Sequence, residues 1–245
     1  MVLEVILKDI ELWLGDCLEL MNRIPDKSID LILADLPYGT TYCKWDVIIP
    51  FESLWKQYKR IRKDRTPIVL FGTEPFSSYL RLSNIKEYKF DWKWNKISKK
   101  GHLVAKKRPL QQTEDVVVFG NGGYNYYPQM LPREKPMKMK EGSKTVIMGG
   151  NGESSAYRTI RNDFYPSNLI IFPTGADRSK VHPTQKPVEL LEYLIKTYTL
   201  EGELVLDNTM GSGSTMVACK NTNRRGVGIE KEKKYYDIAV NRINS

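Results

Sequence analysis

Short apolar runs alternate with amphipathic stretches along most of the chain, a pattern typical of buried strands separated by helices. Apolar runs bounded by polar or turn residues predict strands at 12–14, 31–34, 68–71, 88–94, 116–119, 169–172, 204–206 and 227–229. Helical periodicity predicts helices at 17–24, 51–63, 75–82, 188–198, 214–221 and 231–243. This alternation predicts an α/β fold, with a doubly wound, mostly parallel sheet covered by helices on both faces. No helix separates the fourth and fifth strands, so we expect an antiparallel hairpin at one edge.

Acidic residues follow four of the predicted strands. If the C-terminal third supplies the first two strands of the sheet, and the segments from Leu12 onward supply the next three, the sheet closes into one doubly wound unit. Open α/β sheets bind ligands at the carboxyl ends of their strands, and four acids then lie at that edge: Asp16, Asp35, Asp207 and Glu230. Because an acid after a strand is also a common helix cap, no single one of them decides the function.

The five residues that begin at Asp35 combine a carboxylate, a proline, an aromatic ring and a glycine. Pro37 fixes its own φ and pushes Leu36 toward an extended conformation, while Gly39 lets the chain turn sharply. We therefore expect a stiff loop that presents the Asp35 carboxylate, the Leu36 carbonyl and the Tyr38 ring to one pocket. Two acceptors can hold an exocyclic amino group, and a ring can stack on a flat base. The alternative is an ordinary strand exit with a helix-capping aspartate.

A glycine-rich turn follows the predicted strand 204–206. Its sequence from Asp207 to Thr215 is Asp-Asn-Thr-Met-Gly-Ser-Gly-Ser-Thr, and a predicted helix follows. Glycines at such a turn let a ligand approach the backbone, and the helix N-terminus favours anionic groups. Glu230 ends the next predicted strand, where an acid usually binds ribose hydroxyls. A structural strand–helix–strand unit without a ligand is the alternative.

These segments resemble the motifs of the amino-methylating DNA methyltransferases, which use S-adenosylmethionine. The resemblance is carried by Asp35-Leu36-Pro37-Tyr38, Asp207 through Thr215, His182 through Pro187, and Gly15-Asp16-Cys17. The catalytic motif precedes the cofactor motif, as in the circularly permuted β group of the family, and the match extends over residues 10–120 and 165–243. Two departures stand out. Leu36 replaces the first proline of the catalytic motif, and Asn208 to Met210 replace the usual proline, aromatic and intervening residue.

The resemblance implies a Rossmann-like methyltransferase sheet of the seven-stranded type with an inserted recognition region. It assigns the catalytic role to Asp35, Leu36, Pro37 and Tyr38. For the cofactor it places the ammonium group at Asp207, the ribose hydroxyls at Glu230, and the adenine edge at Asp16 with the backbone N–H of Cys17. It places the cofactor carboxylate at Thr184 and Lys186, with His182 either in contact or packed in its loop. The other expected cofactor-binding residues are Asp35, Asn208, Gly211, Gly213, Ser214 and Thr215.

Residues 121–167 keep neither the helical nor the strand period. Long segments without regular structure inside compact domains are usually functional or disordered. We expect this one to be a target-recognition insertion, which matches its place in the family, with a surface excursion as the alternative. The predicted organisation is a catalytic half in 1–120, the recognition insertion in 121–167, and the cofactor-binding half of the same domain in 168–245.

The formal net charge of +9 favours a polyanionic partner. Basic residues that suit DNA phosphates follow the aromatic strand, with a solvated charged loop as the alternative: Lys96, Lys99, Lys100, Lys106, Lys107 and Arg108, together with Lys44 after the catalytic motif. The three cysteines are far apart and only two histidines accompany them, so we expect neither a metal site nor a disulfide framework. Reduced thiols fit a cytoplasmic protein, and no stretch approaches the ~20 apolar residues of a membrane span.

The leading interpretation is an enzyme that methylates the N6 amine of an adenine flipped out of a specific double-stranded DNA sequence. Within the family, aspartate at the first motif position more often accompanies adenine targets and serine more often N4 of cytosine. N4-cytosine methylation is therefore the nearest alternative. The departures at Leu36 and 208–210 keep open a DNA-binding protein of the same fold without turnover. The resemblance also suggests a prokaryotic or phage source, a homodimer and a companion restriction endonuclease.

Overall fold

The computed structural model describes residues 3–40, 43, 46–138, 160–174 and 185–244. The chain forms two compact units, Met1–Tyr127 with Asn168–Ser245, and Pro128–Ser167. The first unit holds a sheet of the strands β1 (Leu3–Leu7), β2 (Ile10–Leu14), β3 (Leu31–Ala34), β4 (Ile68–Gly72), β5 (Tyr88–Lys100), β6 (Gln111–Phe119), β9 (Leu169–Ile171), β10 (Leu204–Asp207) and β11 (Arg225–Glu230). Its helices are α1 (Cys17–Leu20), α2 (Phe51–Ile61), α3 (Phe76–Ser83), α4 (Val188–Tyr198), α5 (Ser214–Asn221) and α6 (Lys233–Asn244).

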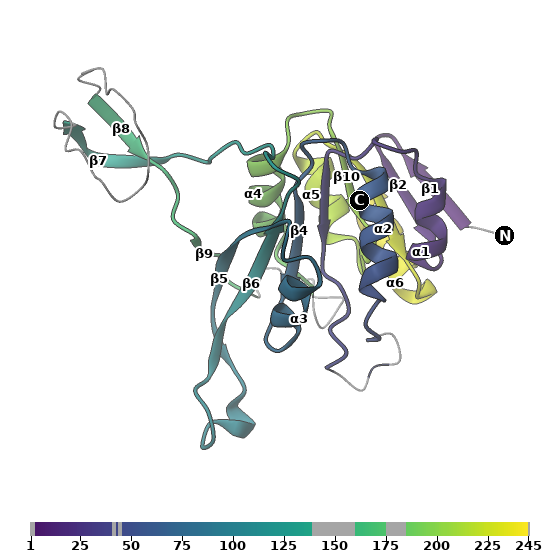
Figure 1. Ribbon diagram of the computed structural model, residues 1–245, viewed down its shortest axis with the longest axis horizontal. Helices are drawn as coiled ribbons and strands as arrows, with labels where there is room; N and C mark the ends of the chain where they lie inside the picture. Colours follow the sequence, from purple (N-terminus) through teal and green to yellow (C-terminus); the bar gives the residue numbers. More distant parts are fainter. Residues whose placement is uncertain (1–2, 41–42, 44–45, 139–159, 175–184, 245) are drawn as a thin grey trace. The chain divides into compact units, whose positions relative to one another are not determined.

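The described strands of this sheet follow the order β1-β2-β11-β10-β3-β4-β6-β5-β9. The five strands from β2 to β4 in this order run parallel. Strands β10 and β11 come from the C-terminal part of the chain, yet they lie between β2 and β3 (Figure 1). The predicted strand arrangement, a doubly wound α/β sheet with C-terminal strands at its centre, is therefore confirmed.

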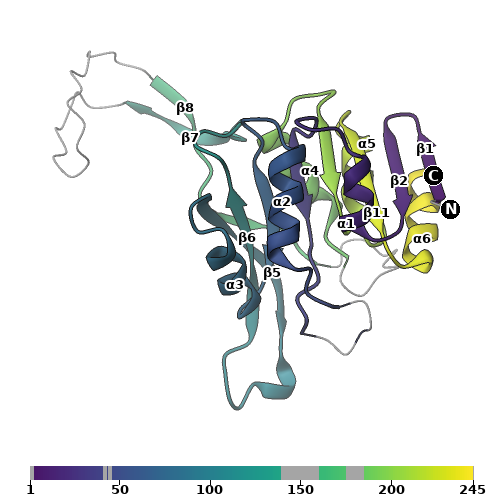
Figure 2. The ribbon, with the colours of Figure 1, turned by 45° about the vertical axis from the view of Figure 1, so that its right-hand side comes forward.

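Strands β5 and β6 form the predicted antiparallel hairpin. Strand β6 also pairs with β4, where Asp115 lies opposite Gly72, the last residue of β4. The hairpin therefore extends past the carboxyl end of β4, and Figure 2 shows β5 and β6 projecting from the sheet. The seven strands from β2 to β5 form the expected type of sheet. Strand β9 extends it beyond β5, and β1, which the sequence pattern did not predict, extends it beyond β2.

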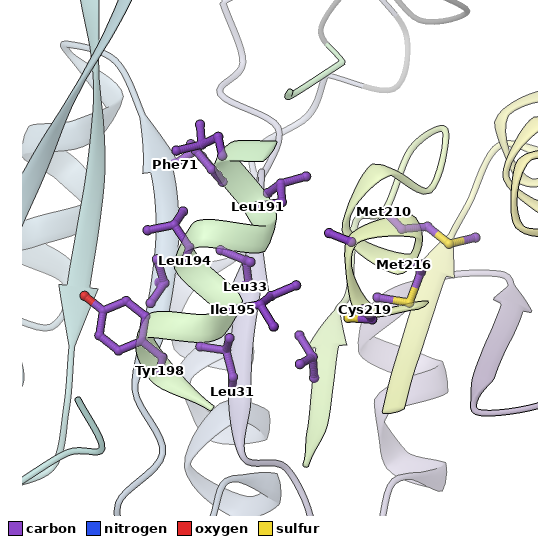
Figure 3. Packing of buried hydrophobic residues seen from close by; sticks show 14 of the residues in the cluster. Leu31, Leu33, Phe71, Leu191, Leu194, Ile195, Tyr198, Met210, Met216 and Cys219 are labelled. Carbon is purple, nitrogen blue, oxygen red and sulfur yellow. The ribbon is translucent and has the colours of Figure 1, made fainter. Parts of the chain in front are cut away.

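Successive residues of the central strands face two different hydrophobic cores. Leu31 and Leu33 of β3 belong to the core under α4, α5 and α6, whereas Ile32 and Ala34 belong to the core under α1, α2 and α3. Figure 3 shows the first core, with Leu31 and Leu33 beside α4. Burial on both faces explains why these strands appear in the sequence as continuous apolar runs rather than alternating ones.

Two local predictions need correction. The helix predicted at 17–24 ends as α1 at Leu20 and continues as a 3-10 turn over Met21–Arg23. In the second unit, strands β7 (Leu131–Lys138) and β8 (Ile160–Phe164) pair antiparallel within the segment predicted to lack regular structure. Strand β7 (LPREKPMK) is mostly polar and contains prolines at 132 and 136, which are rare inside strands, so its sequence does not predict a strand. None of the helices formed by the described residues is long and apolar enough to cross a bilayer.

Candidate active site

A cavity of about 660 Å³ opens where the parallel strands β2, β11, β10 and β3 end. Because these strands are neighbours and run in one direction, their carboxyl ends meet at the same edge of the sheet. The four acids that the sequence placed after strands all line this cavity: Asp16, Asp35, Asp207 and Glu230. Residues far apart in the chain thus contribute to one site.

The loop after β3 brings the catalytic motif to the cavity wall, which includes Asp35, Leu36, Pro37 and Tyr38. Gly39 adopts a φ of +67°, a left-handed conformation that favours glycine. Asp46 holds the turn that follows, because its two carboxylate oxygens accept the backbone N–H of Gly39 at 2.8 Å and of Thr40 at 2.9 Å. No sequence motif indicates this role of Asp46.

Both Asp35 carboxylate oxygens have partners. The Tyr38 hydroxyl donates to Oδ1 at 2.6 Å, and the Lys186 ammonium donates to Oδ2 at 2.5 Å. The Tyr38 hydroxyl also lies 3.1 Å from Glu114 Oε1, and its ring stacks on Phe76 with the centroids 4.8 Å apart. The side chain that was expected to stack on a base therefore rests on Phe76 and contacts Asp35.

Glu114 is a buried acid in this cavity that the sequence pattern did not reveal. It lies on β6 one residue before Asp115, which pairs opposite the end of β4, so the antiparallel pairing carries Glu114 to the carboxyl edge of the sheet. Its side chain pairs with Lys186 at 3.0 Å and with Lys96. No apolar or glycine-rich motif marks this position, so only the strand pairing could have identified it.

Lys96 corrects one sequence expectation. It was expected among the solvent-exposed phosphate-binding residues, but it is only 8% exposed. It lies on β5 two residues after Trp94, which pairs opposite Glu114, and its ammonium group forms an ion pair with that glutamate. Pairing with a buried carboxylate offsets the cost of burying the lysine charge.

The charges of this group shift each other's pKa. Burial raises the pKa of Asp35; Lys186 lowers it and Glu114 raises it, and it lies above the usual range. Burial also raises the pKa of Glu114, but Lys186 and Lys96 outweigh this effect and leave it low. Burial lowers the pKa of Lys186, and the two carboxylates more than reverse that shift. Lys186 is therefore a charged ammonium group.

The glycine-rich turn leads from β10 into α5. Gly211 has a φ of +54° and open space where a side chain would be, and its backbone N–H donates to Glu230 Oε2 at 2.9 Å. Gly213, with a φ of +80°, is the N-cap of α5. A Cβ at Gly213 would come within 2.8 Å of the Ala239 Cβ on α6. Both glycines thus let the backbone make close turns beside the cavity.

Several of the other predicted residues also have structural partners. Asp16 caps α1 by accepting the Leu18 backbone N–H at 2.9 Å, and Cys17, whose thiol pKa is raised by burial, follows it in the wall. Asn208 Oδ1 accepts the Tyr58 hydroxyl at 2.6 Å. Two other predicted residues of the turn also line the cavity: Ser214, whose hydroxyl lies 3.1 Å from Arg242, and Thr215, whose hydroxyl bonds to Asp207.

The expected DNA-contacting residues that the structure describes lie on the β5–β6 hairpin. Lys99 and Lys100 end β5, and Lys100 lines the cavity. Lys106, Lys107 and Arg108 are exposed in the connection between the two strands. Three predicted site residues lie outside the described residues: Lys44, His182 and Thr184.

The arrangement fits a nucleoside cofactor with a charged amino-acid end. Glu230 is the last residue of β11, the strand that follows β10 and α5. An acid at the end of the second strand of such a strand–helix–strand unit usually binds ribose hydroxyls. The open space beside Gly211 lets a ligand approach the backbone. Asp207 adds a buried carboxylate beside the turn, which a cationic group would neutralise.

Comparisons with known proteins show the family of this chain. Residues 29–241 match the family described as DNA methylase (N6_N4_Mtase). The type II methyltransferase M.HinfI of Haemophilus influenzae is 29% identical over 94% of this chain and 67% of its own length. M1.MboII of Moraxella bovis, also a type II methyltransferase, is 23% identical over 91% of this chain and 92% of its own length.

Solved structures share the fold. The complex of M1.HpyAVI with S-adenosylmethionine has a TM-score of 0.62 at 23% identity and covers 95% of this chain and 99% of its own. The cytosine-N4-specific PvuII DNA methyltransferase has a TM-score of 0.71 at 17% identity, and the match covers 96% of this chain and 86% of the PvuII chain. The family match extends from before β3 to α6 and includes both the Asp35 loop and the glycine-rich turn. The chain therefore belongs to the DNA methylase family of N6- and N4-amino methyltransferases, whose methyl donor is S-adenosylmethionine.

Proposed function

We propose that this protein methylates the exocyclic N6 amine of an adenine that is flipped out of a specific DNA sequence. One observation carries the proposal. Asp35, Leu36 and Tyr38 line the same cavity as the acids that fit the cofactor. An exocyclic amine is paired inside the duplex, so the base must leave the stack before the amine can reach such a pocket.

The cofactor-binding residues follow from the chemistry of the cavity wall. S-adenosylmethionine, when bound, supplies a methyl group on a positively charged sulfur. Glu230 would accept hydrogen bonds from the ribose hydroxyls. Asp207 would pair with the ammonium group, and Asp16 with the Cys17 backbone N–H would contact the adenine edge. The backbone at Gly211 would lie against the ligand. Gly213, which was also expected to contact the cofactor, lies against Ala239 of α6 and does not line the cavity.

The target amine needs acceptors that direct its lone pair. The Asp35 carboxylate and the Leu36 carbonyl would accept its two N–H groups, which turns the nitrogen lone pair toward the methyl group. In the structure the Tyr38 hydroxyl donates a hydrogen bond to Asp35 Oδ1. An incoming amine would displace this hydroxyl and let the Tyr38 ring stack on the base. The direct displacement needs no cysteine nucleophile.

Three segments of the chain would have different functions. We assign the catalytic half to 1–120, the cofactor-binding half to 168–245 and target recognition to 121–167. The compact unit Pro128–Ser167 supports the last assignment. Within it, β7 and β8 pair, and Arg133 donates to the Asp163 carbonyl at 2.8 Å and lies over the Phe164 ring. By analogy with M.HinfI and M1.MboII, both type II methyltransferases, we also propose a companion restriction endonuclease.

Nucleoside analysis tests the proposed reaction. DNA from an unmethylated host would be incubated with the protein and S-adenosylmethionine, digested, and examined by mass spectrometry. We expect N6-methyladenine with the wild-type protein and none with Asp35→Ala. N4-methylcytosine instead would reverse the target base and keep the amine mechanism. If the protein does not bind the cofactor and yields no methylated nucleoside, the alternative of a DNA-binding protein without turnover replaces the proposal.

Cofactor binding should depend on pH through Asp207. Burial raises the pKa of Asp207 to about 7, although the Thr215 hydroxyl and the Thr209 backbone N–H lower it. Only the ionised carboxylate attracts an ammonium group, so affinity should rise on the order of 10-fold from about pH 5.5 to about pH 7.5. Calorimetric titration across this range measures the effect. Asp207→Asn should remove the dependence, and an unchanged pH profile in that variant would refute the assignment.

Asp207 should also make the free energy of unfolding depend on pH when no cofactor is added. The pKa of Asp207 is raised above its unfolded value, so its contribution to the free energy of unfolding is complete below about pH 4. It is lost as the pH rises through about 7. The cofactor should therefore stabilise the protein more at neutral than at acidic pH, which thermal denaturation with and without cofactor can follow alongside the calorimetry.

A further inference from the structure

Two carboxylates, two ammonium groups and one phenol form a largely buried cluster that includes Asp35. Its members come from the loop after β3, from β5, from β6 and from the residue just before the N-cap of α4: Asp35, Tyr38, Lys96, Glu114 and Lys186. The side chains of Lys186 and Glu114 are only 10% and 5% exposed. Charges at this depth need partners, and removing one partner leaves the other uncompensated.

Lys186 bridges the two acids of the cluster. Its Nζ atom lies 2.5 Å from Asp35 Oδ2 and 3.0 Å from Glu114 Oε1, and 4.9 Å from the centre of the Phe71 ring beneath it. The other Glu114 oxygen pairs with Lys96. Lys186 is therefore held from three sides, and its direction fixes the rotation of the Asp35 carboxylate.

The Tyr38 hydroxyl lies between the two acids. It is 2.6 Å from Asp35 Oδ1 and 3.1 Å from Glu114 Oε1. When an amine takes Oδ1, the hydroxyl can keep a hydrogen bond by donating to Glu114 alone. A buried hydroxyl left without an acceptor would oppose base entry, so Glu114 lowers that barrier.

We propose that Lys186 and Glu114 are positioning residues for Asp35. Lys186 holds Oδ2 so that Oδ1 faces the target amine, and Glu114 fixes Lys186 and receives the Tyr38 hydroxyl when the base enters. This inference rests on the proposed function, since it concerns the same carboxylate. It differs from the role expected from the sequence, in which Lys186 binds the cofactor carboxylate.

The charges around Asp35 should shift its pKa in opposite directions in two variants. Asp35 faces Lys186 ahead of α4, Glu114 on β6, Tyr38 in its own loop and Asp207 at the end of β10. Lys186 lowers the pKa of Asp35 and Glu114 raises it. Lys186→Met should therefore move the acid limb of the pH–kcat profile to higher pH, and Glu114→Gln should move it to lower pH.

The two roles of Lys186 can be separated by measuring cofactor affinity and kcat together. For Lys186→Met we expect kcat at neutral pH to fall on the order of 100-fold, with the Kd for S-adenosylmethionine within about twofold of the wild type. The matched control is Lys56→Met, which removes an exposed lysine from α2. A large rise in Kd with an unmoved acid limb would assign Lys186 to the cofactor carboxylate and overturn the proposal.

A carboxyl titration keeps the test independent of turnover. The Asp35 carboxyl can be followed by ¹³C NMR in the wild-type protein and in both variants, with Asp35→Asn identifying the signal. Opposite shifts in the two variants support the proposal, and shifts in the same direction contradict it, because general structural damage would move both alike. Wild-type protein that binds cofactor but methylates no DNA would instead refute the proposed function, whatever the titrations show.

Discussion

Replacing Asp35 by alanine is expected to lower the rate of methyl transfer on the order of 10²–10⁴-fold. The variant removes the acceptor that would orient the amine and leaves Lys186 paired only with Glu114. The acids that fit the ribose, ammonium and adenine groups are untouched, so much of the cofactor affinity should remain. Transfer of labelled methyl groups to unmethylated DNA and calorimetric titration with S-adenosylmethionine measure the two quantities on the same preparation.

Asp35→Asn is the matched control for this prediction. It keeps the size of the side chain and one carbonyl oxygen but loses the charge that pairs with Lys186. We expect it to be nearly as inactive as Asp35→Ala, because its amide group cannot accept at both positions. Wild-type rates in the alanine variant would remove Asp35 from the catalytic site.

Removing the charges of the β5–β6 hairpin should weaken DNA binding at every sequence. Lys106, Lys107 and Arg108 are exposed on the hairpin that extends past the carboxyl end of β4. If each contacts one phosphate, replacing all three by alanine should reduce the slope of log K against log salt by about 2.7, at about 0.9 per contact. Fluorescence anisotropy with duplex DNA at several salt concentrations measures the slope.

The control for the hairpin is a triple substitution at exposed lysines of another surface, Lys56, Lys59 and Lys63 on or just after α2. Equal losses in both triple variants would show that net charge alone drives binding. An unchanged slope in the hairpin variant would move the DNA surface elsewhere. Cofactor affinity should stay the same in both variants, since none of the six side chains lines the cavity.

The sequence predicted the edge of the sheet that holds the site, because that edge depends on patterns with a strong physical cause. Strands buried on both faces, such as β3 and β10, appear as uninterrupted apolar runs, and acids or glycines follow them directly. Parallel pairing then brings Asp35 and Asp207 together without further information. These two residues line one cavity although 172 positions separate them.

The residues that were not predicted owe their positions to strand pairing, which the pattern of apolar and polar residues along the chain does not reveal. Glu114 lies among polar residues that resemble a solvent-exposed strand end, and only its register against β4 buries it. Lys96 was grouped with its basic neighbours, but alternation from Trp92 and Trp94 turns it toward Glu114, whereas residues 97–100 lie after an irregularity in the pairing of β5 and are exposed. Strand β1 was not predicted, although it contains the β-branched residues Val5 and Ile6, and it pairs antiparallel with β2.

The position of β10 and β11 has a consequence for folding during synthesis. Strand β2 pairs with β11, and β3 pairs with β10, so these early strands lack their inner neighbours until residues 204–230 have been made. Translation at about 5–20 residues per second leaves both open edges exposed for roughly 10–40 seconds. Unpaired strand edges promote aggregation, so chains released before β10 should depend on chaperones far more than the finished protein.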